Sequence, residues 1–203
     1  MDEFELLKKD WKKREASLPK LSYQDIYKMI LKKSSSNVKW IFIISMVELS
    51  IGLVFLFYTP AYMEQMNYLF VDVLSYLAYP VIIYFVFRFY TNYKKISATS
   101  SVKGLMDSIL RARKTVKHYI IFNLSVIFIT SVCTSVIMYV KKQGGWAVYK
   151  QHSELGDHLI LMALAVLVTA LMIGLCLGVY LLLYGFLLRR LNRNYRELKK
   201  MEV

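Results

Sequence analysis

The sequence predicts an all-α fold, a four-transmembrane-helix bundle of two parallel-repeat hairpins with cytoplasmic amphipathic helices. Three observations lead to this prediction. Four apolar runs each reach the roughly 20 residues that cross about 30 Å of hydrocarbon. The lysines and arginines gather beside the same ends of these runs. The two halves of the chain also leave the membrane through the same short motif.

The apolar runs are expected to form spans at residues 38–58, 69–89, 119–140 and 159–188. Each run holds at most one ionisable residue away from its ends. Hydrophobic residues make up 57% of the chain, which excludes a disordered protein. Only two cysteines are present, too few for a disulfide scaffold. The charged opening does not fit a signal peptide, so the first span is expected to stay as an anchor.

The distribution of positive charge predicts the orientation. Of the 27 lysines and arginines, 24 lie in residues 1–39, 88–118 and 189–203, and 3 lie in residues 141–158. Because loops on the cytoplasmic side carry the excess, both termini and the loop 90–118 are expected in the cytoplasm. The expected location is the cytoplasmic (inner) membrane of a bacterium. Orientation explains most of the net charge of +13, so nucleic acid is not an expected partner.

The first 37 residues are expected to form cytoplasmic amphipathic helices, and residues 189–203 a basic tail. Phe4, Leu7, Trp11 and Leu18 recur at helical spacing and share one face of a predicted helix 4–18. A large apolar anchor such as Trp11 inside a charged rim is typical of a protein-binding hot spot. This helix is therefore a candidate for docking a cytoplasmic protein, and lying on the inner leaflet is the alternative.

Two further amphipathic segments, 23–33 and 101–117, directly precede spans. Ser22 and Asp25 form a predicted capping box at the start of the first. Both segments are expected to lie on the inner leaflet with their cations on anionic headgroups. The cations assigned to this contact are Lys28, Lys32, Lys33, Arg111, Arg113 and Lys114.

An internal repeat relates the two halves. The exits from the second and fourth spans both read R-x-x-x-N-Y-[K/R], at 88–94 and 190–196. V-K-W at 38–40 begins the first span, and V-K-H at 116–118 directly precedes the third. Two spans in each half make the repeats parallel rather than inverted. Either gene duplication or convergence of interfacial residues explains this likeness.

Glu48 is the only acid deep in a span, about ten residues from either end. A charged group is costly there, so Glu48 is expected to face the bundle, to be protonated or to have a polar partner. A structural role and a role in sensing an ion or ligand both remain open. The polar residues considered as partners are Ser45, Ser75, Tyr84, Asn123, Ser131 and Thr134.

Small residues follow one face of the fourth span. Such residues let helices approach closely in a membrane. Contact with another span of the same chain and a homodimer face are the two interpretations. The residues assigned to helix packing are Ala170, Gly174, Gly178 and Gly185.

Catalytic signatures are absent from the sequence. It contains no H-E-x-x-H, G-x-S-x-G, P-loop or dinucleotide fingerprint. The outer segment 152–158 holds four side chains that can bind metal. Because the segment is a short polar connection between spans, a structural role is favoured. We therefore expect no enzyme activity, no cofactor and no metal site.

Three motifs carry a resemblance to a known group. They are L-K-K-D-W-K-K at 7–13, I-Y-K-M-I at 26–30 and K-S-S-S-N-V-K-W-I at 33–41. In these motifs the chain resembles an uncharacterised family of four-span membrane proteins from flavobacteria and related Bacteroidota. Genes of that family often lie beside sigma-factor genes, so the resemblance implies an anti-sigma-like role. The zinc-binding anti-sigma pattern H-x-x-x-C-x-x-C is missing, which implies binding without zinc.

Two functions follow from these observations. The first is a membrane-anchored regulatory protein whose N-terminal helix binds a cytoplasmic partner, with a sigma factor as the candidate. The second is a small oligomeric transporter or channel that uses Glu48 along its path.

Overall fold

The computed structural model describes residues 4–5, 7–11, 22–57, 69–152 and 155–201. The described residues form helices and short turns without a strand, so the predicted all-α class is confirmed. Leu18 and the connection 59–68 lie outside the described residues. The helical elements, in chain order, are α2 (Tyr23–Phe57), α4 (Leu69–Ser97), α5 (Val102–Lys142), α6 (Trp146–His152), α7 (Leu155–Tyr180), the π-helical turn η1 (Leu181–Gly185) and α8 (Phe186–Met201).

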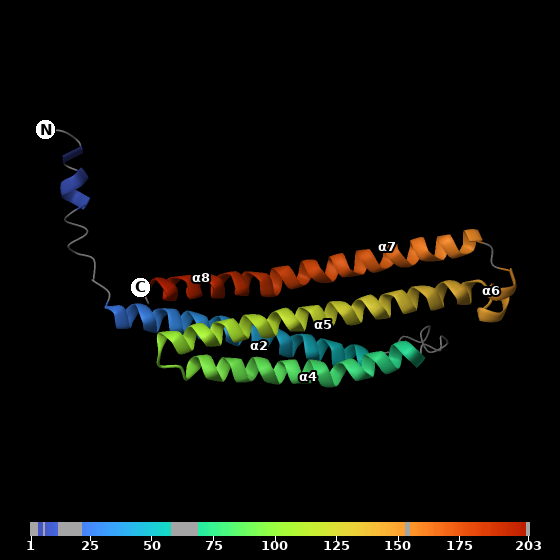
Figure 1. The fold of residues 1–203 in the computed structure, drawn as a ribbon, viewed down its shortest axis with the longest axis horizontal. Coiled ribbons are helices and arrows are strands. Elements are labelled where there is room, and N and C mark those ends of the chain that lie inside the picture. The colour runs from blue at the N-terminus through green and yellow to red at the C-terminus, as the bar shows by residue number, and fades with distance from the viewer. Residues whose placement is uncertain (1–3, 6, 12–21, 58–68, 153–154, 202–203) are drawn as a thin grey trace.

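Four long rods run side by side along the molecule (Figure 1). They are α2, α4, α5 and the continuous rod made of α7, η1 and α8. α2 packs on α4 and α8, and α5 packs on α4, α7 and α8, so the rods form a ring in chain order. All four are long and apolar enough to cross a membrane. By the length and composition of its helices, the chain is therefore a multi-pass membrane protein.

Side-chain caps define two of the helix starts. The backbone N–H of Gln24 donates to Ser22 Oγ at 3.3 Å, and the N–H of Ser22 donates to Asp25 Oδ2 at 3.2 Å. This reciprocal pair is the predicted capping box, which is confirmed. At the start of α5, Ser101 Oγ accepts a hydrogen bond of 3.1 Å from the N–H of Gly104.

The amphipathic segments, expected as separate helices, are continuous with the spans. Segment 23–33 forms the first turns of α2, segment 101–117 forms the first turns of α5, and the basic tail continues the fourth rod as α8. No glycine or proline stands between residues 22 and 51 to end the helix, and Ser34 and Asn37 are buried in the bundle. The amphipathic segments and the spans are thus parts of the same rods.

The packed core lies at one end of these rods. We call this end the basic half (residues 22–41, 86–119 and 184–201) and the remainder of the rods the apolar half. Among the described residues, Val140 is the only large, fully buried side chain that lies outside the basic half. The others are Val38, Ile41, Phe89, Ile96, Leu105, Ile109, Val116, Tyr119, Tyr184, Leu191 and Leu198.

This core corrects the prediction that the two amphipathic segments lie flat on a leaflet. Ile30, Leu105 and Ile109 are at most 3% exposed and pack against the other helices. Their apolar faces are therefore covered by protein, and only outlying side chains such as Tyr23 stay exposed. The cations of these segments remain on the surface, where contact with headgroups is still a prediction.

Candidate functional site

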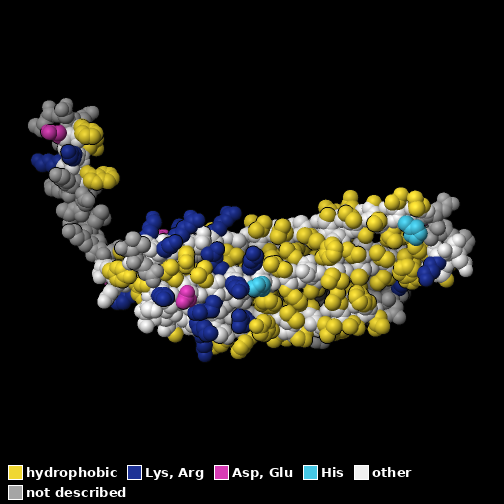
Figure 2. Space-filling model, in the orientation of Figure 1, with side chains coloured by type: hydrophobic (Ala, Val, Ile, Leu, Met, Phe, Trp, Pro, Cys, Tyr) yellow, Lys and Arg dark blue, Asp and Glu magenta, His cyan; other side chains and the backbone are white. Residues whose placement is uncertain are grey.

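The N-terminal turns carry three large apolar side chains that nothing covers. Residues 4–5 and 7–11 are helical. Phe4, Leu7 and Trp11 are 77%, 69% and 73% exposed. Their spacing of three and four residues places them on one face. Figure 2 shows hydrophobic side chains open on these turns, beyond the end of the bundle. The fourth residue of the predicted face, Leu18, lies outside the described residues.

The charges beside this face are balanced. Glu5, Lys8, Lys9 and Asp10 are all exposed, which gives two acids and two bases. A helix that binds an anionic membrane usually carries lysine and arginine in excess on its polar face. The balanced rim therefore favours a protein surface over a bilayer as the target of Trp11.

Glu48 on α2 has two hydroxyl partners from two other rods. Its Oε2 accepts a hydrogen bond of 2.5 Å from Tyr119 Oη of α5 and one of 2.9 Å from Tyr184 Oη of η1. Both tyrosines are at most 2% exposed. One carboxyl group thus joins three of the four rods, which satisfies the expectation that a polar partner meets this acid.

Aromatic rings surround this contact. The ring of Tyr119 meets those of Phe85, Phe89 and Tyr180 with centroids 5.5, 5.4 and 6.4 Å apart. Tyr184 lies in the π-helical turn, a rare local geometry that often marks a functional position. Here the turn contains the side chain that reaches Glu48.

The hydroxyl partners of Glu48 lie near the ends of the third and fourth apolar runs, beside the basic half. Tyr119 follows Lys117 by two residues, and Tyr184 precedes Arg189 by five, which are about 3 and 8 Å along a helix. The two hydroxyls therefore belong to the border between the halves. The depth of Glu48 within the membrane stays a prediction.

The six polar residues considered as partners of Glu48 do not bond to it. Ser45, Ser75 and Asn123 donate to backbone carbonyls of their own helices. The Tyr84 ring is exposed, with the Arg88 guanidinium 5.8 Å from its centroid. The tyrosine partners were missed because they lie 71 and 136 positions from Glu48 along the chain, on other rods. The spacing of Tyr180 and Tyr184, four apart on one face, was the available signal.

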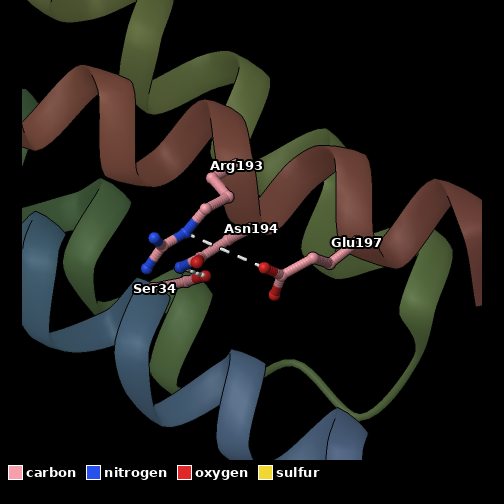
Figure 3. A network of polar contacts seen from close by, with 4 residues as sticks. All are labelled: Ser34, Arg193, Asn194 and Glu197. Atoms are coloured by element: carbon pink, nitrogen blue, oxygen red, sulfur yellow. Dashed lines mark hydrogen bonds and ion pairs between the residues drawn. The ribbon is translucent and has the colours of Figure 1, made fainter.

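The repeated exit motif places an asparagine in the same role twice. Asn92 Nδ2 of α4 donates to Thr115 Oγ1 of α5 at 3.0 Å, and Asn194 Nδ2 of α8 donates to Ser34 Oγ of α2 at 2.9 Å. Figure 3 shows the second pair between its two helices. All four residues are at most 7% exposed. Each asparagine bonds to the first helix of the other half, as a parallel repeat around one axis requires.

The small residues of the fourth span do not pack within the chain. A Cβ added to Gly174 or Gly178 would meet no atom within 4 Å, and one added to Gly185 would meet only Leu181 of its own rod. Ala170 is exposed. Contact with another span of the same chain is therefore wrong for this row, because α7 touches α5 through other residues such as Thr169, which bonds Ser131. The homodimer interpretation remains a prediction.

The connection between α5 and α7 is held by a tyrosine and a histidine. Tyr149 Oη lies 2.7 Å from His158 Nδ1, and the two rings meet edge to face. Burial, together with Tyr139 and Asp157, raises the pKa of the Tyr149 hydroxyl. Among the described residues no three side chains of His, Cys, Asp or Glu gather. The absence of a metal or an enzyme activity stays a prediction.

The cations assigned to headgroups are spread around the basic half. Lys28, Lys32, Lys33, Arg111 and Lys114 are exposed, whereas Arg113 is half-buried. Arg113 Nη1 donates to Asn192 Oδ1 of α8 at 3.0 Å, so this residue joins two helices. Figure 2 shows lysine and arginine side chains gathered over one half of the rods and hydrophobic ones over the other.

The comparison with known proteins identifies a family. The model of one protein family, described as a Domain of unknown function (DUF8845), matches residues 24–203. No curated protein and no solved structure matches the chain. The matched region contains all four rods and leaves out the N-terminal turns with Phe4, Leu7 and Trp11.

Proposed function

We propose that this chain, which belongs to the DUF8845 family, is a membrane-embedded regulatory protein that holds a cytoplasmic partner on its N-terminal helix. The observation that carries the proposal is the exposed face of Phe4, Leu7 and Trp11. Leaving three large apolar side chains in water is costly unless another surface covers them. The rods would then serve as the anchor that keeps this face at the membrane.

A sigma factor is the partner that the sequence motifs suggest. The resemblance rests on motifs at 7–13, 26–30 and 33–41, and the first of these contains Leu7 and Trp11. Zinc would take no part, because the zinc-binding pattern is missing. Binding at this face would keep the partner at the membrane and away from its cytoplasmic targets.

The balanced charge of the helix supports a protein partner over a lipid one. Residues 1–15 hold five acids and five bases, so an anionic bilayer gains little net electrostatic energy from this segment. A protein interface, in contrast, commonly has an apolar anchor with a mixed polar rim.

A binding measurement with matched variants tests this proposal. The full-length protein in detergent is titrated with purified sigma factors of the source bacterium. Leu7→Ala with Trp11→Ala is expected to weaken the bound complex by at least about a hundredfold, since each hot-spot residue contributes about 2 kcal/mol or more. Lys9→Ala lies on the opposite side of the same helix and is the control, expected to change affinity by less than about threefold. Equal affinity for the double variant and the wild type would refute the proposal.

The alternative of a transporter or channel depends on Glu48. Its carboxyl group is held by two hydroxyls from two other rods. Glu48 lines neither the pocket between α2 and α8 nor the two apolar cavities along α5 and α7. This arrangement favours a structural role for Glu48. A flux assay in liposomes with the wild type and Glu48→Gln decides: a flux that the variant abolishes would restore the transport hypothesis.

A further inference from the structure

A basic pocket opens between α2 and α8 at the border of the two halves. It has a volume of about 780 Å³. Five of its lining side chains are cationic, and none of its lining residues is acidic. The cations are Lys32 and Lys33 from α2 and Arg189, Arg190 and Arg193 from α8.

Only weak compensation is present for this charge. Glu197 lies 3.8 Å from Arg193 Nε, and both side chains are largely exposed, at 46% and 69% (Figure 3). An exposed pair of this kind contributes little. Five cations around one cavity repel one another and favour a bound anion.

The lining of the pocket also contains uncharged polar side chains. Asn194 is committed to Ser34 Oγ, as Figure 3 shows. Asn37, 7% exposed, also lines the pocket, and its side chain makes no hydrogen bond to any other described residue. The amide of Asn37 reaches the pocket, and its N–H groups can donate to an oxygen of a bound ligand.

The guanidinium of Arg190 lies over the ring of Phe186, which also lines the pocket. Its Cζ lies 4.1 Å from the centroid of the Phe186 ring, which fixes the group at the mouth. Arginine forks match the oxygens of phosphate in pairs, so a pocket with three arginines is suited to that group. The chemistry that the pocket would recognise is a phosphate.

The position of the pocket indicates where the phosphate comes from. Lys32 and Lys33 lie a few residues before the first apolar run, and Phe186 belongs to the last turn of the fourth. Leu182, one turn further along this rod, is 77% exposed in the apolar half. A ligand in the pocket would have cations around its head and exposed aliphatic side chains below it. Basic pockets between membrane helices on the inner side commonly hold lipid head groups.

We infer that the pocket between α2 and α8 binds the phosphate of an anionic phospholipid, with Lys32, Lys33 and the three arginines around it and Asn37 beneath. This binding is independent of the partner proposed for the N-terminal helix. It assigns a specific site to cations that orientation alone leaves unassigned, and it includes Arg189, Arg190 and Arg193, which the sequence did not single out for this role.

Native mass spectrometry of the full-length protein in detergent, titrated with phosphatidylglycerol, tests the inference. Lys32→Gln with Lys33→Gln is expected to weaken binding about thirtyfold, because each lysine near an anionic lipid contributes about fivefold. The matched control, Lys95→Gln with Lys117→Gln, removes two exposed lysines outside the pocket and is expected to change affinity by less than about threefold. Equal losses for both pairs, or no loss for the first, would overturn the site.

A second variant separates a binding defect from a folding defect. Asn37→Asp places a carboxyl group among the cations without a change in shape. The thermal midpoint without lipid is expected to stay equal or rise, because the new charge relieves repulsion, while affinity for phosphatidylglycerol falls at least about tenfold since a like charge now faces the phosphate. Unchanged affinity in this variant would contradict the pocket as the phosphate site.

Two further ligands identify the source of the phosphate. Zwitterionic phosphatidylcholine is expected to bind at least about tenfold more weakly than phosphatidylglycerol, because its choline opposes the five cations. Soluble glycerol 3-phosphate is expected not to displace phosphatidylglycerol at equal concentration. Equal binding of phosphatidylcholine would refute recognition of charge, and efficient displacement by glycerol 3-phosphate would refute the membrane as source.

Discussion

The basic half and the apolar half of the same rods are built by opposite rules. In the basic half, Ile41, Leu105 and Leu191 are completely buried between helices. In the apolar half, Val54, Leu77 and Leu171 are each at least 65% exposed. Helices surrounded by water must bury their apolar faces on one another, whereas lipid solvates such faces without that drive. The comparison shows that the buried, packed core lies at one end of this molecule and the exposed apolar surface at the other.

The largest effect is expected from a cavity in the basic half. Leu105→Ala should destabilise the protein by about 2–5 kcal/mol, because Leu105 is fully buried between helices. Leu77→Ala, at an exposed position of α4 in the apolar half, should cost less than about 1 kcal/mol. Thermal unfolding in detergent measures both. Similar losses at the two positions would remove the distinction between the halves.

A smaller effect is expected at the border, where Glu48 joins three rods. Tyr119→Phe removes the donor of a 2.5 Å hydrogen bond and should destabilise the protein by about 1–2 kcal/mol. Tyr76→Phe, an exposed tyrosine of α4, is the control and should be neutral. The thermal midpoints report the difference. An unchanged thermal midpoint in Tyr119→Phe would contradict a structural role for this contact.

The repeated asparagines should contribute about equally. A double-mutant cycle of Asn194→Ala and Ser34→Ala, followed by unfolding, should give a coupling of about 1 kcal/mol, the usual value for a neutral hydrogen bond. The cycle of Asn92→Ala and Thr115→Ala should match it, because both pairs are buried and join the first repeat of the chain to the second. A coupling confined to one pair would show that the repeat has lost its symmetry.

The smallest effect is expected along the small residues of the apolar half. Gly174→Ala should be neutral or stabilise by up to about 1 kcal/mol, because open space surrounds the position and alanine favours the helix. Gly174→Leu is the second variant and probes a homodimer through sedimentation in detergent. An unchanged oligomeric state in Gly174→Leu would remove this face from consideration as a dimer surface.

The fold class and the four rods were predictable from the sequence because span length depends on composition alone. The ends of the rods were not, since Ser34 and Asn37 appear as a polar break in the sequence and are buried inside a helix in the structure. The capping box at Ser22 and Asp25 was predictable because all its atoms are local.

The candidate sites divide in the same way. The helical face of Phe4, Leu7 and Trp11 follows from periodicity. The hydroxyls that meet Glu48 come from residues 71 and 136 positions away, so only the arrangement of rods brings them together. The basic pocket likewise needs α2 and α8 side by side, which no local pattern records.

Photo-crosslinking in intact cells tests the central claim most directly. A photoreactive amino acid in place of Leu7 should give crosslinks to a protein, because this position lies on the exposed apolar face. The same amino acid in place of Lys9, on the opposite side of the helix, should give few. Crosslinks to lipid alone at position 7, or equal protein crosslinks at both positions, would contradict the account of a partner held on the N-terminal helix.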